Sequence, residues 1–302
     1  MRFGEDVHEK RRNGDISRFL QKPLNVSLAE TLPLPLFRTH LMLMGFLYYG
    51  CHPREAFDIQ RALGDALQVS PRSKKLRRLT CNTLRNNIAH YYEKMVNAHR
   101  PFGGVIDYLK RLVRIVNRSQ LDDLYRSGKG CLLVTGHFGA VEYLPVFLAS
   151  SGYRVSMVVR FKTRKLRDIS FAKSRTIDLE LIDADEGHVV HRVTGALKRG
   201  RILITFCDEF SHWRPDPHAC LTVFGSSMPA DRTLDVLHRR TGVPACVGVM
   251  QRRKGSVDLV IEPLDASRRS LSVQAWETLV VYIRRYPEQW YQWHKLTARR
   301  FF

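Results

Sequence analysis

Hydrophobic residues follow one spacing in the first third of the chain and another in the rest. Between residues 36 and 117 apolar side chains recur at helical spacing, for example in FDIQRALGDAL (57–67) and TLRNNIAHYYEKMV (83–96). Prolines interrupt this pattern at positions 53, 71 and 101. Because proline disrupts the interior of a helix, the pattern predicts several separate helices in this region.

Beyond residue 117, short apolar runs alternate with helix-like segments. Buried strands are expected at CLLVTGH (131–137), RVSMVVR (154–160), RILITFCDE (201–209), VPACVGVMQR (243–252) and VDLVIEPL (257–264). Helices are expected at LDDLYRSGKG (121–130), GAVEYLPVFLASSGY (139–153), VTGALKRG (193–200), DRTLDVLHRRTG (231–242) and WETLVVYIRRYPEQWYQWH (276–294). This alternation predicts an α/β fold with a mostly parallel sheet flanked by helices.

The two patterns divide the chain into three parts. We expect a polar N-terminal tail at 1–31, a helical region with a membrane-associating segment at 32–117, and an α/β domain at 118–302. The membrane candidate is LPLPLFRTHLMLMGFLYYGC (32–51), whose uninterrupted apolar stretch is shorter than the ~20 residues that a spanning helix needs. An interfacial helix fits this segment better than a span, and a buried core helix is the alternative. The polar N-terminus lacks the apolar core of a signal peptide.

The charge balance favours a polyanionic partner. The chain has 49 Lys and Arg against 29 Asp and Glu, a formal net charge of +20. Nucleic acid, an anionic membrane, a phosphorylated substrate or an acidic carrier protein would all suit this excess. No helix-turn-helix signature, zinc pattern or RNA-recognition motif is apparent, so nucleic acid is not expected as a partner, although a basic nucleic-acid-binding protein is the rival class.

The cysteines and most histidines give no metal signature. Six cysteines stand without a CxxC pair, which argues against a zinc knuckle or a thioredoxin-like motif and favours a reduced, cytosol-facing protein. His188 and His191 are expected at the surface. His212 and His218 share a loop in which packing is favoured over metal binding. We therefore expect no metal and no cofactor.

The sharpest chemical feature is TGHFGAVE (135–142). His137 follows an expected strand, lies between glycines and precedes an expected helix that holds Glu142. A glutamate in this place can fold back and accept a hydrogen bond from one ring nitrogen, which leaves the other nitrogen as a general base. Because no serine nucleophile is apparent nearby, the nucleophile would be a substrate hydroxyl. The spacing alone is equally compatible with a structural histidine.

The segment GHFGAVE after a hydrophobic strand resembles the first block of the bacterial lipid A biosynthesis (lauroyl/myristoyl) acyltransferases, within the lysophospholipid acyltransferase group. Later segments are similar to further blocks of that family in matching order: SMVVRFKTRKLRD with Arg160, LITFCDEF with Asp208, Val223-Phe224-Gly225 with Pro229 and Thr233, TGVPACV, and YPEQWYQWHK. The resemblance extends from Leu32 to Phe302. It departs at Cys207-Asp208-Glu209, where the family usually shows an Asp-Gln/His-Asp type of block, and at Ser226-Ser227-Met228.

The resemblance implies an acyltransferase at the cytoplasmic face of a bacterial inner membrane. His137 would remove the proton of an acceptor hydroxyl and Glu142 would stabilise the imidazolium. The substrate-binding residues would be Arg160, Arg175, Asp208, Phe224 and Gly225. The donor would be acyl carrier protein or acyl-CoA, and the acceptor a lipid A-type glycolipid or a related lipid. A family member that binds lipid without turnover is the remaining alternative.

Overall fold

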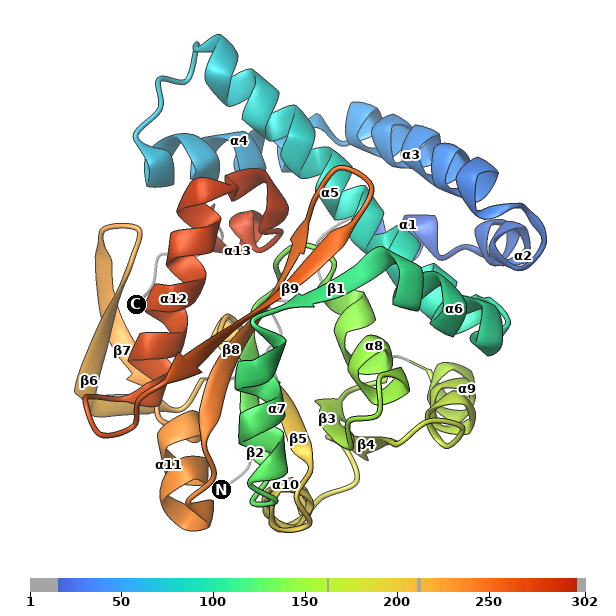
Figure 1. Ribbon diagram of the computed structural model, residues 1–302. Helices are drawn as coiled ribbons and strands as arrows, with labels where there is room; N and C mark the ends of the chain where they lie inside the picture. Colours follow the sequence, from blue (N-terminus) through green and yellow to red (C-terminus); the bar gives the residue numbers. More distant parts are fainter. Residues whose placement is uncertain (1–15, 162, 211–212, 298–302) are drawn as a thin grey trace.

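The apolar runs of the second part of the chain form one central sheet (Figure 1). A computed structural model describes residues 16–161, 163–210 and 213–297, and this part of the chain contains a seven-stranded sheet and a separate two-stranded hairpin. The sheet strands are β1 Val113–Val116, β2 Cys131–Thr135, β3 Val155–Val159, β4 Leu179–Asp183, β5 Ile202–Phe206, β8 Ala245–Arg252 and β9 Val257–Leu264. The hairpin strands are β6 Pro215–Val223 and β7 Ser226–Asp231.

The sheet is mostly parallel, as the alternating pattern predicts. Its spatial order is β1-β9-β8-β2-β5-β3-β4. Strands β8, β2, β5, β3 and β4 all run in one direction, whereas β9 pairs antiparallel with β8 and parallel with β1. The carboxyl ends of β2 and β5 therefore lie side by side at one edge. The prediction of an α/β fold with a mostly parallel sheet is confirmed.

Helices cover the sheet and its carboxyl edge (Figure 1). They are α1 Ile16–Leu20, α2 Pro23–Thr31, α3 Leu34–Cys51, α4 Pro53–Leu67, α5 Lys74–His99, α6 Phe102–Leu112, α7 Arg118–Arg126, α8 Leu144–Ser150, α9 Arg164–Ser174, α10 Val189–Lys198, α11 Thr233–Thr241, α12 Leu271–Arg285 and α13 Trp293–Thr297, with short 3-10 turns η2 Val141–Tyr143 and η4 Pro287–Gln289. Helix α12 packs on β8 and β9 and contacts α11, while α7 packs on β9 and α8 on β3. The long helix α5 contacts both η2 and η4, the two segments that flank the candidate site.

Two expected boundaries are wrong. The polar tail does not extend to residue 31, because α1 and α2 lie there and bury Ile16, Leu20 and Ala29. Residues 113–116, expected at the end of the helical region, instead form β1 at the edge of the sheet. Between residues 16 and 112 the regular elements of the described chain are the helices α1 to α6, as expected for an N-terminal helical region.

The membrane candidate becomes α3, which is partly a core helix. Phe37, Leu41 and Tyr48 are buried against the rest of the protein. On the opposite side, Leu36, Leu43 and Leu47 are each more than half exposed. Among the helices in the described part of the chain, none combines the length and the apolar character needed to cross a membrane.

The expected C-terminal helix is interrupted, and strand β4 and the β6–β7 hairpin are among the elements that were not anticipated. Helix α12 ends at Arg285 because Pro287 follows, and the chain continues through η4 to α13. Strand β4 (LELID) has too few consecutive apolar residues to stand out in the sequence. The β6–β7 hairpin turns at Phe224-Gly225, and positive φ at both residues is typical of the tight turns that match the twist of paired strands.

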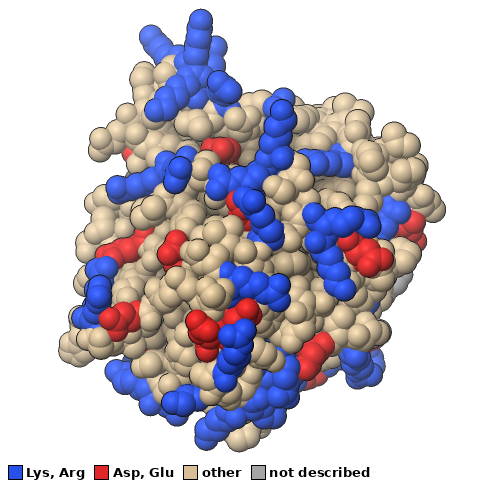
Figure 2. Space-filling view, in the orientation of Figure 1, with Lys and Arg blue, Asp and Glu red and all other residues tan. Residues whose placement is uncertain are grey.

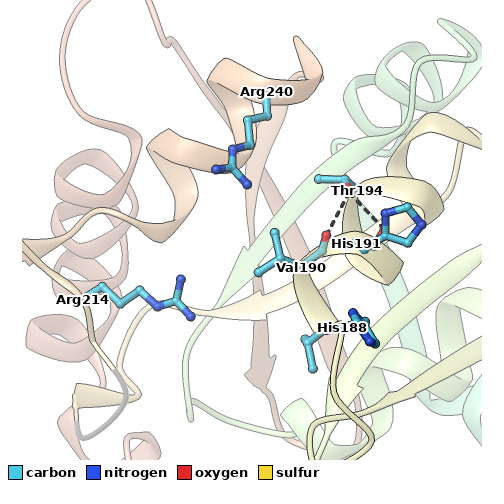
Figure 3. Close-up of a pocket in the computed structure, with 7 residues that line it drawn as sticks. His188, Val190, His191, Thr194, Arg214 and Arg240 are labelled. Carbon is cyan, nitrogen blue, oxygen red and sulfur yellow. Dashed lines mark hydrogen bonds between the residues drawn. The ribbon is translucent and has the colours of Figure 1, made fainter. Parts of the chain in front are cut away.

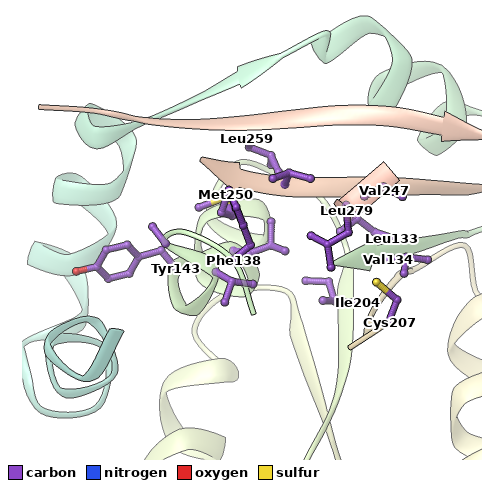
Figure 4. Close-up of a cluster of buried hydrophobic side chains, with 14 of the residues drawn as sticks. Leu133, Val134, Phe138, Tyr143, Ile204, Cys207, Val247, Met250, Leu259 and Leu279 are labelled. Carbon is purple, nitrogen blue, oxygen red and sulfur yellow. The ribbon is translucent and has the colours of Figure 1, made fainter. Parts of the chain in front are cut away.

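A cluster of buried hydrophobic side chains between the sheet and α12 supports the loop that carries the candidate site (Figure 4). Leu133 and Val134 of β2, Val247 and Met250 of β8, and Leu279 of α12 are all buried in one cluster. Interiors of this kind are close-packed and resist displacement. The loop that follows β2 is consequently anchored on a rigid base.

Candidate active site

The loop after β2 is shaped by two glycines and tied to the C-terminal segment. A Cβ at Gly136 would collide with Leu279. Gly139 has φ +58, and a Cβ there would collide with the carbonyl oxygen of Met250, so neither position accepts a side chain. Phe138 bridges to Trp290, and the N–H of Gly139 donates to the carbonyl of Gln289 (2.8 Å). These contacts fix the backbone on both sides of His137.

Asp208 orients the His137 ring. The Nδ1 of His137 lies 2.8 Å from Oδ1 of Asp208, while the backbone N–H of His137 donates to Oδ2 at 2.7 Å. The indole N–H of Trp290 donates to the same Oδ2 at 2.8 Å. Asp208 is fully buried and both of its carboxylate oxygens are engaged inside the protein, so it is not available to a substrate. His137 and Asp208 meet at the carboxyl ends of neighbouring strands, where α/β proteins place their chemistry.

The second ring nitrogen of His137 faces another carboxylate. Its Nε2 lies 3.1 Å from Oε1 of Glu209, and Oε2 of Glu209 lies 3.5 Å from Nζ of Lys295. Phe206 stacks on the ring, with centroids 4.6 Å apart. Burial disfavours the charged imidazolium, but Asp208 and Glu209 together outweigh it and raise the pKa of His137 to about 9. His137 is therefore an imidazolium at neutral pH in this arrangement.

The expected pairing of Glu142 with His137 is wrong. Glu142 lies on η2, and its Oε1 is 3.2 Å from Nδ1 of His90 and 3.6 Å from Nζ of Lys94. The contact with His90 lacks the alignment of a hydrogen bond. Burial, followed by the nearby positive charges, lowers the pKa of His90 well below its ordinary value. Sequence spacing suggested a local pair, whereas the tertiary fold brings Asp208 to the ring from the next strand.

A bridge of rings connects the two histidines. The His90 ring lies 4.1 Å from that of Tyr291, and the Tyr291 ring lies 5.8 Å from that of His137. Both His90 and Tyr291 are buried. Glu142 is thus a neighbour of the His137 site through His90 and Tyr291, without touching the catalytic candidate itself.

A buried ion pair fastens α5 to β8 beside this bridge. Arg252 donates to Oε1 of Glu93 through Nη2 (2.7 Å) and Nε (3.2 Å), and through Nη1 to Asn86 (3.1 Å). Burial raises the pKa of Glu93 to about 7, against the lowering effect of Arg252. Gln289 bonds the backbone N–H and C=O of Arg252 through its side-chain amide, which links the pair to η4.

An apolar cavity of about 330 Å³ has Glu142 in its wall. Most of its lining is aliphatic or aromatic and comes from α8, β3, α9 and the end of α5, including Met95, Val146, Met157, Phe161, Leu166 and Ile169. Lys94, Glu142 and Arg160 supply charged groups to its wall. Deep apolar clefts with a few polar groups are the usual form of small-molecule sites.

Four of the five expected substrate-binding residues lie apart from this cavity: Arg175, Asp208, Phe224 and Gly225. Arg160 lines it and pairs with Asp185 (3.1 Å), but Arg175 is an exposed C-cap of α9 that does not contribute to its wall. Phe224 and Gly225 form the hairpin turn, where the Phe224 ring packs near Trp290 and Trp293 with centroids 5.8 and 5.2 Å away. Phe224 therefore supports the tryptophan that bonds Asp208.

Several functional neighbours were missed from the sequence. Glu209 and Lys295 were not singled out, although the acidic pair Asp208-Glu209 at a strand end was a usable signal. The aromatic residues Trp290, Tyr291 and Trp293 are buried in the core.

The remaining histidines do not build a metal centre in the described residues. No group of three or more His, Cys, Asp or Glu side chains there is placed to hold a metal ion. His188 and His191 are exposed, as expected, and line an open recess with Arg214 and Arg240 (Figure 3). His218 is also exposed, and His212 lies outside the described residues.

Comparison with known proteins adds no assignment. No protein-family model matches the chain, and a search of curated proteins finds no significant relative. The function must therefore be inferred from the residues and their geometry.

Proposed function

We propose that this protein is an acyltransferase, which moves a fatty acyl chain from a thioester donor to a hydroxyl of a lipid or glycolipid. The observation that carries the proposal is the buried His137–Asp208 pair at the carboxyl edge of the sheet. The apolar cavity that Glu142 helps to line supports it, since an acyl chain needs a dry site. The ordered motif resemblance to lipid A acyltransferases supports the same reaction class.

His137 acts first as a general base and then as a general acid. The neutral imidazole takes the proton of the acceptor hydroxyl as that oxygen attacks the thioester carbonyl carbon. The tetrahedral intermediate then collapses, the C–S bond breaks, and the leaving sulfur receives the proton from His137. Asp208 holds the ring tautomer and balances the imidazolium that forms between these steps, the part played by the carboxylate of a serine-protease triad. In this scheme Glu142 belongs to the cavity wall.

In this proposal Arg160, which lines the cavity, binds an anionic group of the acceptor or carrier. Its guanidinium can form two parallel hydrogen bonds to phosphate, a geometry that lysine cannot reproduce. Arg160→Lys should raise the KM for a phosphorylated acceptor and Arg160→Ala should raise it further, with smaller effects on a dephosphorylated analogue. Arg175→Ala is the matched control, because this exposed arginine lies away from the cavity. An equal rise in KM for both acceptors would mean that Arg160 has a structural role.

The surface suits an anionic membrane, and we place the protein at the cytoplasmic face of a bacterial inner membrane. Figure 2 shows Lys and Arg gathered at the top of that view, where Figure 1 places the start of α5. Five basic residues are exposed there: Arg72, Lys74, Lys75, Arg77 and Arg78. Cations at a helix N-terminus oppose the helix dipole, so this cluster costs some stability. An acidic acyl carrier protein, or acyl-CoA, would approach such a basic chain by electrostatic steering.

The test compares lipids from cells that lack the gene and cells complemented with it. Mass spectrometry of lipid extracts should show one added acyl group on the product when wild-type protein is present. His137→Gln should remove this product, since general acid–base catalysis contributes roughly 10²–10⁴-fold. Glu142→Gln should reduce it less, because Glu142 does not contact His137. His191→Gln is the control at an exposed histidine. Unchanged product with His137→Gln would reject the assignment.

A further inference from the structure

The nitrogen that a general base would use is already occupied. Nδ1 of His137 is committed to Asp208, so only Nε2 remains to receive a proton from an acceptor. That nitrogen lies 3.1 Å from Oε1 of Glu209. An acceptor hydroxyl must approach the same nitrogen within hydrogen-bond distance for proton transfer. Glu209 and the acceptor therefore compete for one position.

Lys295 offers the Glu209 carboxylate a second partner. Its Nζ lies 3.5 Å from Oε2 of Glu209, and both side chains are about one-third exposed, at 30% and 35%. Asp208, by contrast, is fully buried and held by His137 and Trp290. Of the two carboxylates beside His137, Glu209 is the solvent-accessible one, with its side chain 35% exposed against 0% for Asp208.

Several charged and titratable groups surround the His137 ring. Asp208 and Glu209 face it from the end of β5, Lys295 approaches Glu209 from α13, and Tyr291 lies beside the ring. On the α5 and η2 side, the titratable or charged groups are His90, Lys94 and Glu142. Of all these side chains in the described residues, only the two carboxylates contact the imidazole nitrogens.

We propose that Glu209 is a positioning residue that closes the acceptor position, and that it must leave Nε2 of His137 before transfer can begin. In the closed form Glu209 bridges His137 and Lys295; in the open form the acceptor hydroxyl replaces it and the carboxylate stays with Lys295. The proposal rests on the proposed function for its consequence on transfer. The closing contact itself is independent of any substrate.

The closed form also controls the charge of the base. With both carboxylates in place the pKa of His137 is raised to about 9, so the ring carries a proton and cannot accept another. Removing one adjacent carboxylate lowers the pKa of His137, because that negative charge stabilises the imidazolium. An opposite charge at this distance shifts a pKa by roughly one to three units. Displacement of Glu209 thus clears Nε2 and lowers its affinity for the proton in one movement.

The first experiment measures the His137 pKa without any substrate. The full chain is labelled with ¹³C/¹⁵N-histidine, and the His137 ring signal is assigned by its loss in His137→Gln. Titration by NMR should give a pKa roughly one to three units lower in Glu209→Gln than in wild type. Lys295→Met should shift the pKa upward instead, since it removes the competing cation. Glu277→Gln is the matched control, because Glu277 lies on α12 and pairs with Arg269. Equal pKa values in wild type and Glu209→Gln would overturn the proposal.

The second experiment asks whether the closing contact limits transfer. Glu209→Gln should lower the KM for the acceptor and move the acidic limb of the kcat/KM profile to lower pH, in step with the NMR titration. Lys295→Met should raise that KM. A shifted His137 pKa with an unchanged acceptor KM and pH profile would overturn the closing role. Absence of transfer in every variant, wild type included, would reject the proposed function, and the NMR titration would still decide whether Glu209 holds Nε2.

Discussion

The buried carboxylate beside His137 explains how a histidine with little solvent contact can carry charge. Asp208 receives three hydrogen-bonding contacts, from the His137 ring, the His137 backbone and Trp290. None of these could be read from local spacing, because Asp208 lies 71 residues further along the chain. The sequence did place both residues at the ends of expected strands, but it did not show that the two strands are neighbours. The predicted partner of the ring was Glu142, which is nearer in sequence, whereas Asp208 is nearer in space.

Asp208→Asn should disable the site while leaving the fold in place. Asparagine preserves the shape, but it cannot balance an imidazolium and favours the wrong ring tautomer. We expect transfer to fall by roughly 10²–10⁴-fold and the His137 pKa to fall toward 6.5. The measurements are kcat and the NMR titration of His137. Asp265→Asn, at an exposed turn, serves as the control.

The raised His137 pKa also predicts how stability depends on pH. The folded state holds this proton up to pH of about 9, whereas the unfolded chain releases it near 6.5. The resulting stabilisation is complete below pH 6.5 and is lost as pH rises through 9; it amounts to about 3 kcal/mol. Urea unfolding across this window should show wild type losing stability faster than His137→Gln. Parallel curves for the two proteins would contradict the assigned pKa.

At the scale of elements, the sequence predicted those strands whose apolar runs were long enough to be distinctive. Strands β2, β3, β5, β8 and β9 were anticipated within a few residues of their bounds. Strand β1 was missed because its alternating sequence VRIV also fits the preceding helical pattern, and the hairpin was missed because β6 is largely polar and exposed. Edge and hairpin strands depend on partners that are distant in the chain, which local patterns do not record.

The ion pair between α5 and β8 should be a strong point of attachment between the N-terminal helices and the sheet. Arg252→Met leaves the buried Glu93 without its partner, and breaking such a pair costs about 3–5 kcal/mol. The double variant Glu93→Gln/Arg252→Met should recover much of that loss. Denaturant unfolding of both single variants and the double variant measures the coupling. Arg268→Met, which removes an exposed ion pair with Asp265, should change stability by less than about 1 kcal/mol.

Over the whole molecule, basic and apolar surfaces should act together in membrane binding. Charge attraction is screened by salt, whereas apolar insertion is not. We expect vesicles containing anionic lipid to bind the protein, less strongly at high salt but without full release. Leu43→Glu/Leu47→Glu should weaken binding at every salt concentration, while Lys74→Gln/Arg77→Gln should act mainly at low salt. Sedimentation with vesicles measures both effects.

A matched control distinguishes loss of α3 insertion from a general effect of adding charge to an exposed apolar residue. Val281→Glu adds a charge at an apolar residue of α12 that is 64% exposed, close to the 68% of Leu43, but on a different helix. It should leave vesicle binding intact if α3 is the inserted element. Complete release of wild type by salt alone would exclude insertion of residues 32–51.

The pairing of β1 with β9 has a consequence for how the molecule is made. Val113 cannot pair until Val257 has been synthesised. The loop around His137 likewise depends on residues 289–291: Phe138 bridges to Trp290, and the N–H of Gly139 donates to the carbonyl of Gln289. Such long-range pairings are slow to form. Translation must therefore pass residues 289–291 before the His137 loop has its supports. Products terminated before these residues would lack an assembled site.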